Sequence, residues 1–192
     1  MTVAALLLAA GASRRFGADD KLLARLGGAA LVAHAARSLH LPQVDIRIAV
    51  AASDAVAEIL RDHDFRVVMV APGQSLSASL SAGMLAVGRG PVQRAIVALG
   101  DMPFLRPGDL AALLALAGDG PASAWHMDAP TPPAVFPASW FPRLAGLSGD
   151  RGAGALLRGL APGRRLHLPS ERLRDIDTCA DLAEARALAR AT

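Results

Sequence analysis

The chain opens with an apolar run that stops at a loop of small and cationic residues. Residues 3–8 are all Val, Ala or Leu, and the loop that follows brings Gly and Ser together with Arg14, Arg15 and Lys21. An uninterrupted apolar run of this length is typical of a strand buried on both faces. Small residues let backbone N–H groups approach an anion, which nearby cations neutralise. The pattern predicts a strand followed by a phosphate-holding loop; an ordinary strand-to-helix turn is the alternative.

Strand and helix patterns then alternate, which predicts an α/β fold with a mostly parallel sheet. Strands are expected at 3–8, 46–51, 65–70 and 95–99. Helices are expected at 29–40, from Ser53-Asp54 to about 61, from Ser75 or Ser77 to 86, and from 107 to about 116.

The pattern loosens after residue 118. Strands at 122–126 and 134–136 are expected to pair across a proline-rich loop, with the stretch 129–142 over a site or at an edge. Further elements are expected at 152–160 (helix), 166–168 and 173–177 (strands) and 180–190 (helix). No internal repeat or long linker divides the sequence, so we expect one domain over residues 1–192.

The composition limits the classes of partner and the cellular location that we expect. The net charge is only +3 and aromatic residues make up 4% of the chain, which disfavours a nucleic-acid partner. No stretch of about 20 apolar residues is free of charge, so no membrane span is expected. Cys179 is the single cysteine, which excludes an internal disulfide and fits a reducing cytoplasm. We therefore expect a cytoplasmic protein.

An aspartate follows the strand expected at 95–99. Gly100-Asp101-Met102-Pro103 places this carboxylate at the carboxyl edge of the sheet, where open α/β sheets bind ligands. Such a carboxylate suits Mg²⁺, which takes a few carboxylates and completes its shell with phosphate and water. A turn or helix-capping aspartate is an equally good interpretation.

A second acidic pair stands near the end of the chain. In Asp175-Ile176-Asp177-Thr178, strand alternation would place both aspartates on one face, and one of them would complete the metal site. The alternative is a cap for the last helix, a role that Thr178 and Asp181 also suit. Together the motifs predict a triphosphate held by the cationic loop, Mg²⁺ held by two carboxylates, and pyrophosphate neutralised by Arg15 and Lys21 as it leaves.

Four ordered motifs resemble those of the MobA-like nucleotidyltransferases, over nearly the whole chain. They are Leu8-Ala9-Ala10-Gly11-x-Ser13-x-Arg15-Phe16-Gly17-x-x-x-Lys21, Gly100-Asp101-Met102-Pro103, Gly149-Asp150-Arg151-Gly152-Ala153 and Asp175-Ile176-Asp177-Thr178. The third motif is similar to that of the molybdenum cofactor cytidylyltransferase branch.

The resemblance implies a Rossmann-like three-layer α/β/α fold and Mg²⁺-dependent transfer of CMP from CTP to molybdopterin already carrying molybdenum. The Ala9-Ala10-Gly11 loop favours cytosine, because guanylyl-transferring relatives tend to have Ala-Gly-Gly. A molybdoenzyme that receives the product is a further implied partner. The implied catalytic residues are Arg15, Lys21 and Asp101, and the implied metal ligands are Asp101 and Asp177. The implied nucleotide-binding residues are Leu8, Ala9, Ala10, Gly11, Ser13, Arg15, Lys21, Ser75, Ser79 and Gly83.

Some features depart from the family. Thr131-Pro132-Pro133 stands where the family usually has a glycine or asparagine before a Val-x-Phe strand, which bears on acceptor recognition. The serine-rich segment 73–83 matches a family segment near the base and ribose, but it also suits a serine-capped helix start with Gly83 serving close packing. The five histidines show no metal-ligand spacing, so they are interpreted as surface or helix residues, with His126 facing the acceptor as the alternative.

Three other functions are alternatives to CMP transfer onto molybdopterin. The same chemistry on a sugar, polyol or phospholactate phosphate is the nearest rival. A non-catalytic accessory factor of a molybdoenzyme is disfavoured because Arg15, Lys21, Asp101 and Asp177 are all present. A Rossmann oxidoreductase is disfavoured because the first loop has the wrong glycines and no suitable acidic residue follows the second strand.

Overall fold

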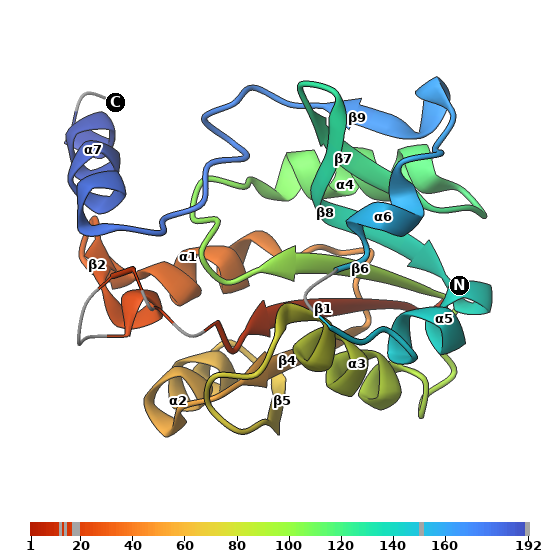
Figure 1. Cartoon of the computed structure of the whole chain (residues 1–192), viewed down its shortest axis with the longest axis horizontal. Helices are drawn as coiled ribbons and strands as arrows, with labels where there is room; N and C mark the ends of the chain where they lie inside the picture. Colours follow the sequence, from red (N-terminus) through yellow and green to blue (C-terminus); the bar gives the residue numbers. More distant parts are fainter. Residues whose placement is uncertain (12, 14, 17–19, 150–151, 191–192) are drawn as a thin grey trace.

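A seven-stranded sheet forms the centre of the molecule (Figure 1). The structure, a computed structural model, describes residues 1–11, 13, 15–16, 20–149 and 152–190. The strands are β1 (Val3–Ala9), β2 (Arg25–Leu26), β3 (Ala29–Ala30), β4 (Ile46–Ala51), β5 (Arg66–Met69), β6 (Arg94–Leu99), β7 (Ala122–His126), β8 (Ala129–Pro137) and β9 (Arg165–His167). The α-helices are α1 (Leu31–Ser38), α2 (Asp54–Asp62), α3 (Leu76–Val87), α4 (Pro107–Ala117), α5 (Phe141–Ala145), α6 (Gly154–Leu157) and α7 (Cys179–Arg190). Short 3₁₀ turns η1 (Lys21–Leu23), η2 (Ala138–Trp140) and η3 (Pro162–Arg164) complete the set.

The strand order of the sheet is β5-β4-β1-β6-β8-β7-β9, and every neighbouring pair is parallel except the two that β8 makes. The chain leaves β1, builds β4 and β5 on one side of it, and then returns to place β6 on the other side. The strand order therefore reverses between β1 and β6. Ligands of open α/β sheets bind at such a point, outside the carboxyl ends of the strands.

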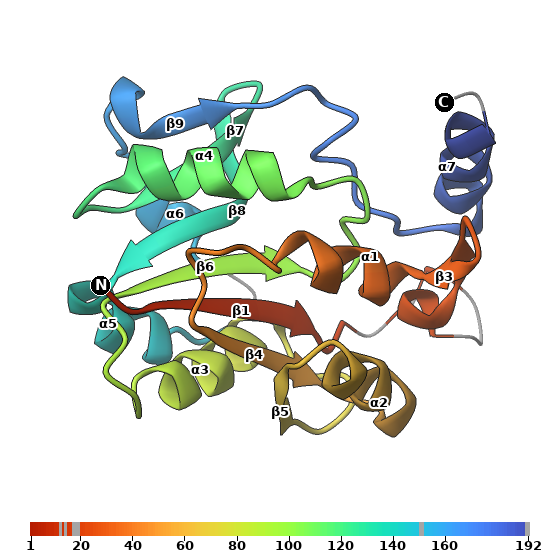
Figure 2. The same cartoon turned by 180° about the vertical axis from the view of Figure 1, so that it is seen from behind.

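Helices cover both faces of the sheet, so the expected three-layer α/β/α fold is confirmed. Side chains of Val3, Ala5 and Leu7 enter a core built with α1, α2 and α4. Those of Ala4 and Leu6 enter a second core built with α3, α5 and α6. The first layer is seen in Figure 2 and the second in Figure 1. Because both faces of β1 are buried, its sequence is apolar without alternation.

A third, smaller apolar cluster joins distant parts of the chain beside the end of β1. It contains Phe16, Leu26, Leu31, Ile176, Leu182 and Ala185. The β2–β3 hairpin belongs to it and turns at Gly27 and Gly28, whose φ angles of 55° and 87° suit glycine. Helix α7 lies at this end of the molecule, next to β2 (Figure 1). The cluster brings the segment before Asp177 next to the loop that carries Arg15.

The proline-rich stretch differs in part from its expectation, because residues 129–133, expected in the loop before the strand at 134–136, already belong to β8. Pro130, Pro132 and Pro133 precede the part of β8 that pairs with β6, which begins at Ala134. Before Ala134, β8 does not pair with β6, so the N–H groups that the prolines lack are not needed on the side that faces β6. Ser123 compensates for the irregular register with β7, since its Oγ donates to the carbonyl of Thr131 at 2.9 Å.

The strand expected at 173–177 is also wrong. This segment crosses the carboxyl edge of the sheet without joining a ladder, and Ile176 N donates to the carbonyl of Asp101 at 3.0 Å. The expected helix at 29–40 begins at Leu31, because residues 29–30 belong to the hairpin. The helix expected at 152–160 is confined to Gly154–Leu157. In the described part of the chain, no helix has the length and apolar character needed to cross a membrane.

Candidate active site

The ends of β1 and β6 meet closely because a glycine follows β6. Gly100 N donates to the carbonyl of Leu8 at 2.9 Å. A Cβ at position 100 would lie 3.2 Å from Ala9 Cβ and 3.4 Å from Leu22 Cδ2. A side chain there would push apart β1, β6 and the turn that carries Lys21. Gly100 thereby sets Asp101 directly against η1.

Lys21 forms the centre of the charged cluster. Its Nζ donates to Asp101 Oδ2 at 2.6 Å and to Asp177 Oδ1 at 2.7 Å. The Lys21 side chain is only 8% exposed, whereas those of Asp101 and Asp177 are 18% and 30% exposed. Burial alone would lower the pKa of Lys21, but the charges and hydrogen bonds of the two aspartates outweigh it and raise that pKa above 10.5. Residues 80 and 156 positions apart from Lys21 thus converge on one ammonium group.

The backbone of η1 is held by short polar side chains. Asp20 Oδ1 accepts from Leu22 N at 3.0 Å and so caps the turn. Asp20 Oδ2 accepts from Ser53 Oγ at 3.2 Å, and Ser53 also caps α2. Ser13 Oγ accepts from Lys21 N at 3.2 Å. Ser13 therefore acts on the position of Lys21, a connection that its place in the predicted loop does not reveal.

Arg15 reaches the same cluster from the outside. Its guanidinium lies 3.0 Å from Asp177 Oδ2, and its side chain is 76% exposed. Of the two adjacent arginines, Arg15 is described by the structure and Arg14 lies outside the described residues, as do Ala12 and Gly17 of the same motif. Arg15 and Lys21 therefore each contact a different oxygen of Asp177.

The chain at the end of β1 changes from buried to solvent-exposed within three residues. Ala9 and Ala10 are buried, with 3% and 4% exposed, and Ala10 packs with Leu6 and Leu8 in the core beneath α3. Gly11 is exposed and has no atom within 4 Å of the place where a Cβ would stand. The backbone at Gly11 is therefore accessible to a ligand, and its contact with a triphosphate stays a prediction.

Asp177 is free for these cations because other residues cap α7. Thr178 Oγ1 accepts from Asp181 N at 3.1 Å, and Asp181 Oδ2 accepts from Thr178 N at 2.7 Å. This reciprocal pair is a capping box. The sequence offered both residues as caps of this helix. Because they make the capping hydrogen bonds, Asp177 is not needed for them.

The serine-rich segment starts α3. Ser75 is the N-cap, because its Oγ accepts from Ala78 N at 3.2 Å. Ser79 Oγ donates to the carbonyl of Ser75 at 3.2 Å, and Ser77 Oγ donates to the carbonyl of Gly149. Gly83 faces the sheet, where a Cβ would lie 2.6 Å from Leu6 Cδ1. The structure thus gives Gly83 a packing role beneath the segment, while Asp150 and Arg151 of the neighbouring motif lie outside the described residues.

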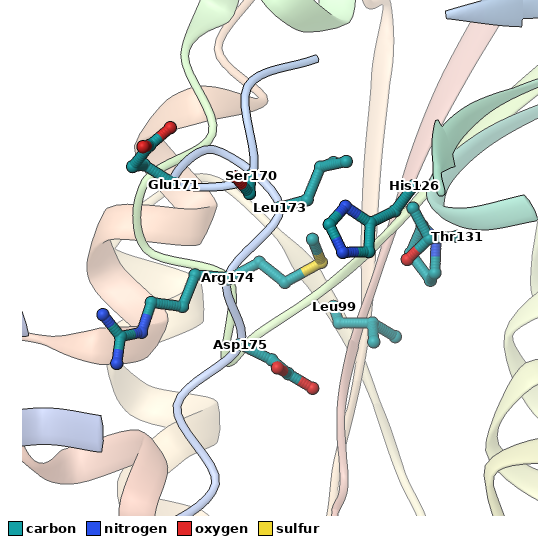
Figure 3. Close-up of a pocket in the computed structure, with 10 residues that line it drawn as sticks. Leu99, His126, Thr131, Ser170, Glu171, Leu173, Arg174 and Asp175 are labelled. Atoms are coloured by element: carbon teal, nitrogen blue, oxygen red, sulfur yellow. The ribbon is translucent and has the colours of Figure 1, made fainter. Parts of the chain in front are cut away.

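A cavity of about 510 Å³ adjoins the charged cluster on the β7–β8 side (Figure 3). Asp175 stands at its wall next to the pair already described. Loss of hydration, followed by the charges of Asp101 and Asp177, raises the pKa of Asp175 above 3.8. The cavity is lined by Leu99, Met102, His126, Thr131, Pro132, Ser170, Glu171, Leu173, Arg174 and Asp175.

His126 lies among the cavity side chains, and the preferred interpretation of the sequence did not place it there. It ends β7, at the same edge of the sheet as the end of β6, and its ring points into the space between Thr131, Leu99 and Asp175 (Figure 3). The available signal was its position at the end of a strand with an apolar, buried run before it. Without knowledge that β7 is parallel to β6, that position did not distinguish the two ends of the sheet.

The donor atoms fit a divalent cation that prefers oxygen. Asp101 Oδ1 is buried and has no hydrogen-bond partner among the described residues. No third His, Cys, Asp or Glu of those residues joins a preformed metal cluster. A pair of carboxylates with few other protein ligands suits Mg²⁺, which usually completes its coordination with substrate phosphates and water.

Comparisons with known proteins agree with this geometry. The sequence profile of the MobA-like NTP transferase domain matches residues 5–167. A probable molybdenum cofactor guanylyltransferase of Pyrococcus horikoshii is 33% identical over 112 residues, which are 56% of this chain and 52% of that protein. The purine catabolism protein PucB of Bacillus subtilis is 41% identical over 86 residues, which are 43% of this chain and 42% of that protein. The chain thus matches about half the length of these curated relatives.

A solved structure extends the likeness to the whole chain. A nucleotidyl transferase from Methanothermobacter thermautotrophicus superposes with a TM-score of 0.83 and 23% identity, covering 100% of this chain and 99% of that one. At that identity the likeness concerns the fold. The profile match spans most of the sequence and includes the ends of β1 and β6 with Lys21 and Asp101. The chain therefore belongs to the MobA-like NTP transferase family.

Proposed function

We propose that this chain is a Mg²⁺-dependent nucleotidyltransferase that transfers CMP from CTP to molybdenum-loaded molybdopterin. The observation that carries the proposal is that Lys21 Nζ lies 2.6 Å from Asp101 Oδ2 and 2.7 Å from Asp177 Oδ1, beside the exposed backbone of Gly11 at the strand-order reversal. Family membership and the molybdenum cofactor relative support the reaction class and the acceptor.

In this reaction an acceptor phosphate oxygen attacks the α-phosphorus of the nucleotide, and the bond from that phosphorus to the β-phosphate oxygen breaks. Lys21 and Arg15 stand where they can neutralise the pyrophosphate that leaves. The acceptor is already an anion, so the chain needs no side-chain nucleophile or general base. Asp101 and Asp177 would hold Mg²⁺, which supplies further charge compensation at the phosphates.

Two observations bear on the nucleotide. The second loop alanine, Ala10, has its methyl group buried in the core beneath α3, and this Ala-Ala-Gly loop favours CTP. The similarity to a probable guanylyltransferase favours GTP as the second candidate donor. Ser75 and Ser79 at the start of α3 are the proposed contacts to base or ribose.

The cavity beside the cluster suits the uncharged body of the acceptor. Its volume of about 510 Å³ falls within the range of about 300–1,000 Å³ that is usual for ligand pockets. Asp175 and Glu171 in its lining outnumber Arg174, which is paired with Glu184, and so disfavour a phosphate there; the acceptor phosphate belongs at the Lys21 end. His126 and Thr131 would then offer hydrogen bonds to a polar ring.

The test is a panel of CTP, GTP, ATP and UTP, each incubated with Mg²⁺ and molybdenum-loaded molybdopterin. Dinucleotide formation and pyrophosphate release are measured together. We expect CTP to give the highest rate. A preference for GTP would show that GTP, not CTP, is the nucleotide donor, and the proposed reaction class would be unchanged. Turnover with a sugar, polyol or phospholactate phosphate in place of molybdopterin would replace the acceptor, and no turnover with any pair would contradict the proposal.

The variant Asp101→Ala supplies the mechanistic control. We expect it to abolish pyrophosphate release, because the carboxylate shared by Lys21 and the proposed metal is removed. Circular dichroism and the melting temperature report whether the fold is retained. Full activity in a folded Asp101→Ala protein would remove Asp101 from the site.

A further inference from the structure

We infer that Lys21 and the divalent cation occupy the Asp101–Asp177 pair in turn. Lys21 holds the two carboxylates before substrate arrives, and its ammonium moves to the triphosphate when the metal–nucleotide complex binds. Lys21 thus reserves the metal site for nucleotide-bound metal and contacts the triphosphate once that complex has bound. This inference deepens the proposed function and rests on it.

The geometry places the ammonium where a shared metal would compete with it. Lys21 Nζ lies 2.6 Å from Asp101 Oδ2 and 2.7 Å from Asp177 Oδ1, so it already bridges one oxygen from each carboxylate. A divalent cation bridging the same pair needs oxygens at about 2.0–2.1 Å for Mg²⁺. The ammonium and the cation cannot both lie between these two oxygens.

The charges of the cluster favour exchange over simple addition. Asp101, Asp175 and Asp177 supply three carboxylates, and Lys21 with Arg15 supplies two cations. A free divalent cation would meet Lys21 at close range in a poorly solvated space. A nucleotide triphosphate brings several negative charges and gives the displaced ammonium a new partner. Metal and nucleotide are therefore expected to enter together.

The scaffold allows the ammonium to move while the carboxylates stay. The Lys21 backbone is held by Ser13 Oγ, and Asp20 caps the turn, but four methylene groups separate that backbone from Nζ. The two acidic segments are tied directly, because Ile176 N donates to the carbonyl of Asp101 at 3.0 Å. Asp101 Oδ1 is buried without a partner and remains open to a cation.

Direct Mn²⁺ binding tests the inference without turnover. Mn²⁺ is titrated into the wild type, Lys21→Gln and Arg15→Gln without nucleotide, and the free ion is followed by electron paramagnetic resonance. Lys21→Gln should bind Mn²⁺ at least about tenfold more tightly than the wild type, because a cation between two carboxylates has been removed. Arg15→Gln is the matched control: it also removes a cation from Asp177, but from an exposed position, and should change affinity less than about threefold.

The same Mn²⁺ titration is repeated with CTP present and with a double variant. Adding CTP should tighten Mn²⁺ binding by the wild type, and this coupling should be largely lost in Lys21→Gln. Adding Asp101→Asn to Lys21→Gln should reverse the gain in Mn²⁺ affinity. Equal affinities of the wild type and a folded Lys21→Gln for free Mn²⁺ would overturn the inference.

A second measurement needs no variant. Lys21 is the single lysine of the chain, so ¹³C-lysine labelling gives one Cε–Hε signal in the NMR spectrum. Mg²⁺ alone should leave this signal in place, and CTP with Mg²⁺ should shift it. A shift produced in full by Mg²⁺ alone would overturn the exchange. If no nucleotide changes either readout, the proposed function fails, while the comparison of free Mn²⁺ affinities still decides whether Lys21 competes with metal.

Discussion

At the scale of single residues, the chain uses nineteen arginines and one lysine, and the lysine stands between the two carboxylates. A compact ammonium can donate to oxygens of two carboxylates, here at 2.6 and 2.7 Å, whereas the planar guanidinium fork suits two oxygens of one carboxylate. Lys21→Arg is therefore not a conservative change at this position.

Alkaline pH should weaken the fold through this one residue. The pKa of Lys21 is raised in the folded state above 10.5 by Asp101 and Asp177. Its contribution to stability is thus complete below pH 10.5 and is lost as the pH rises through the raised pKa. Urea unfolding between about pH 9 and about pH 12 should show a steeper loss of unfolding free energy for the wild type than for Lys21→Met.

The composition leaves few other groups that could contribute to the difference between the wild type and Lys21→Met at alkaline pH. The chain has no tyrosine and one cysteine, so few other side chains titrate in that range. Parallel losses in the two proteins would show that Lys21 is not the source.

The sequence indicated the charged residues of the candidate site better than the cavity beside them. Asp101 follows an apolar strand and Lys21 follows a glycine loop, and both patterns carry information about chemistry. His126 follows a strand whose direction and neighbours only the tertiary structure defines. The support that Ser13 and Asp20 give to Lys21 is likewise a matter of side-chain geometry.

At the scale of elements, apolar runs predicted β1, β4 and β6 well because these strands are buried on both faces. The exceptions arise where hydrogen-bond partners decide the structure. Proline content predicted a loop before the strand at 134–136, yet residues 129–133 belong to β8, because the β6 side of this part of the strand needs no N–H donors. Alternating acidic residues predicted a strand at 173–177, yet none of the strands that the structure describes pairs with this segment.

The packing of α3 on the sheet gives a prediction at this scale. Gly83→Ala would place a Cβ 2.6 Å from Leu6 Cδ1 and 3.0 Å from Val50 Cγ2, both fully buried side chains. Overpacking costs about 1–3 kcal/mol, against a gain of about 1 kcal/mol in helix propensity. We expect a net loss of about 1 kcal/mol or more in the unfolding free energy, measured with urea.

Gly108 in α4 is the control for this substitution. A Cβ there would meet no atom within 4 Å. Gly108→Ala should therefore leave stability unchanged or raise it by up to about 1 kcal/mol. If Gly83→Ala proves as stable as Gly108→Ala, α3 can move away from the sheet without cost.

At the scale of the whole molecule, the cleft has two sides built from different parts of the chain. The side that we propose for the nucleotide comes from the ends of β1 and β6 with η1. The cavity side comes from the β7–β8 hairpin and the returning segment 168–178. Asp175 and Asp177 lie on that segment, so it is shared by both sides.

Two histidines at strand ends test this division. His126→Ala should raise the KM for the acceptor about tenfold and leave the KM for CTP unchanged, because the ring lines the cavity. His167→Ala is the matched control: it is also exposed, at the end of the adjacent strand β9, and does not line the cavity. Steady-state kinetics with each substrate varied in turn measures the difference. A loss of kcat with both KM values unchanged would argue that His126 does not bind the acceptor.

The reversed direction of β8 has a consequence for the divergence of such proteins. Because β8 runs against its neighbours, β7 and β8 form one hairpin that lines the cavity through His126, Thr131 and Pro132, while Lys21 and Asp101 are supplied from elsewhere. A single contiguous exchange of residues 122–137 would therefore reshape what the cleft accepts and leave its charged centre in place. Substitutions confined to this hairpin can thus diversify the cavity without replacing Lys21, Asp101 or Asp177.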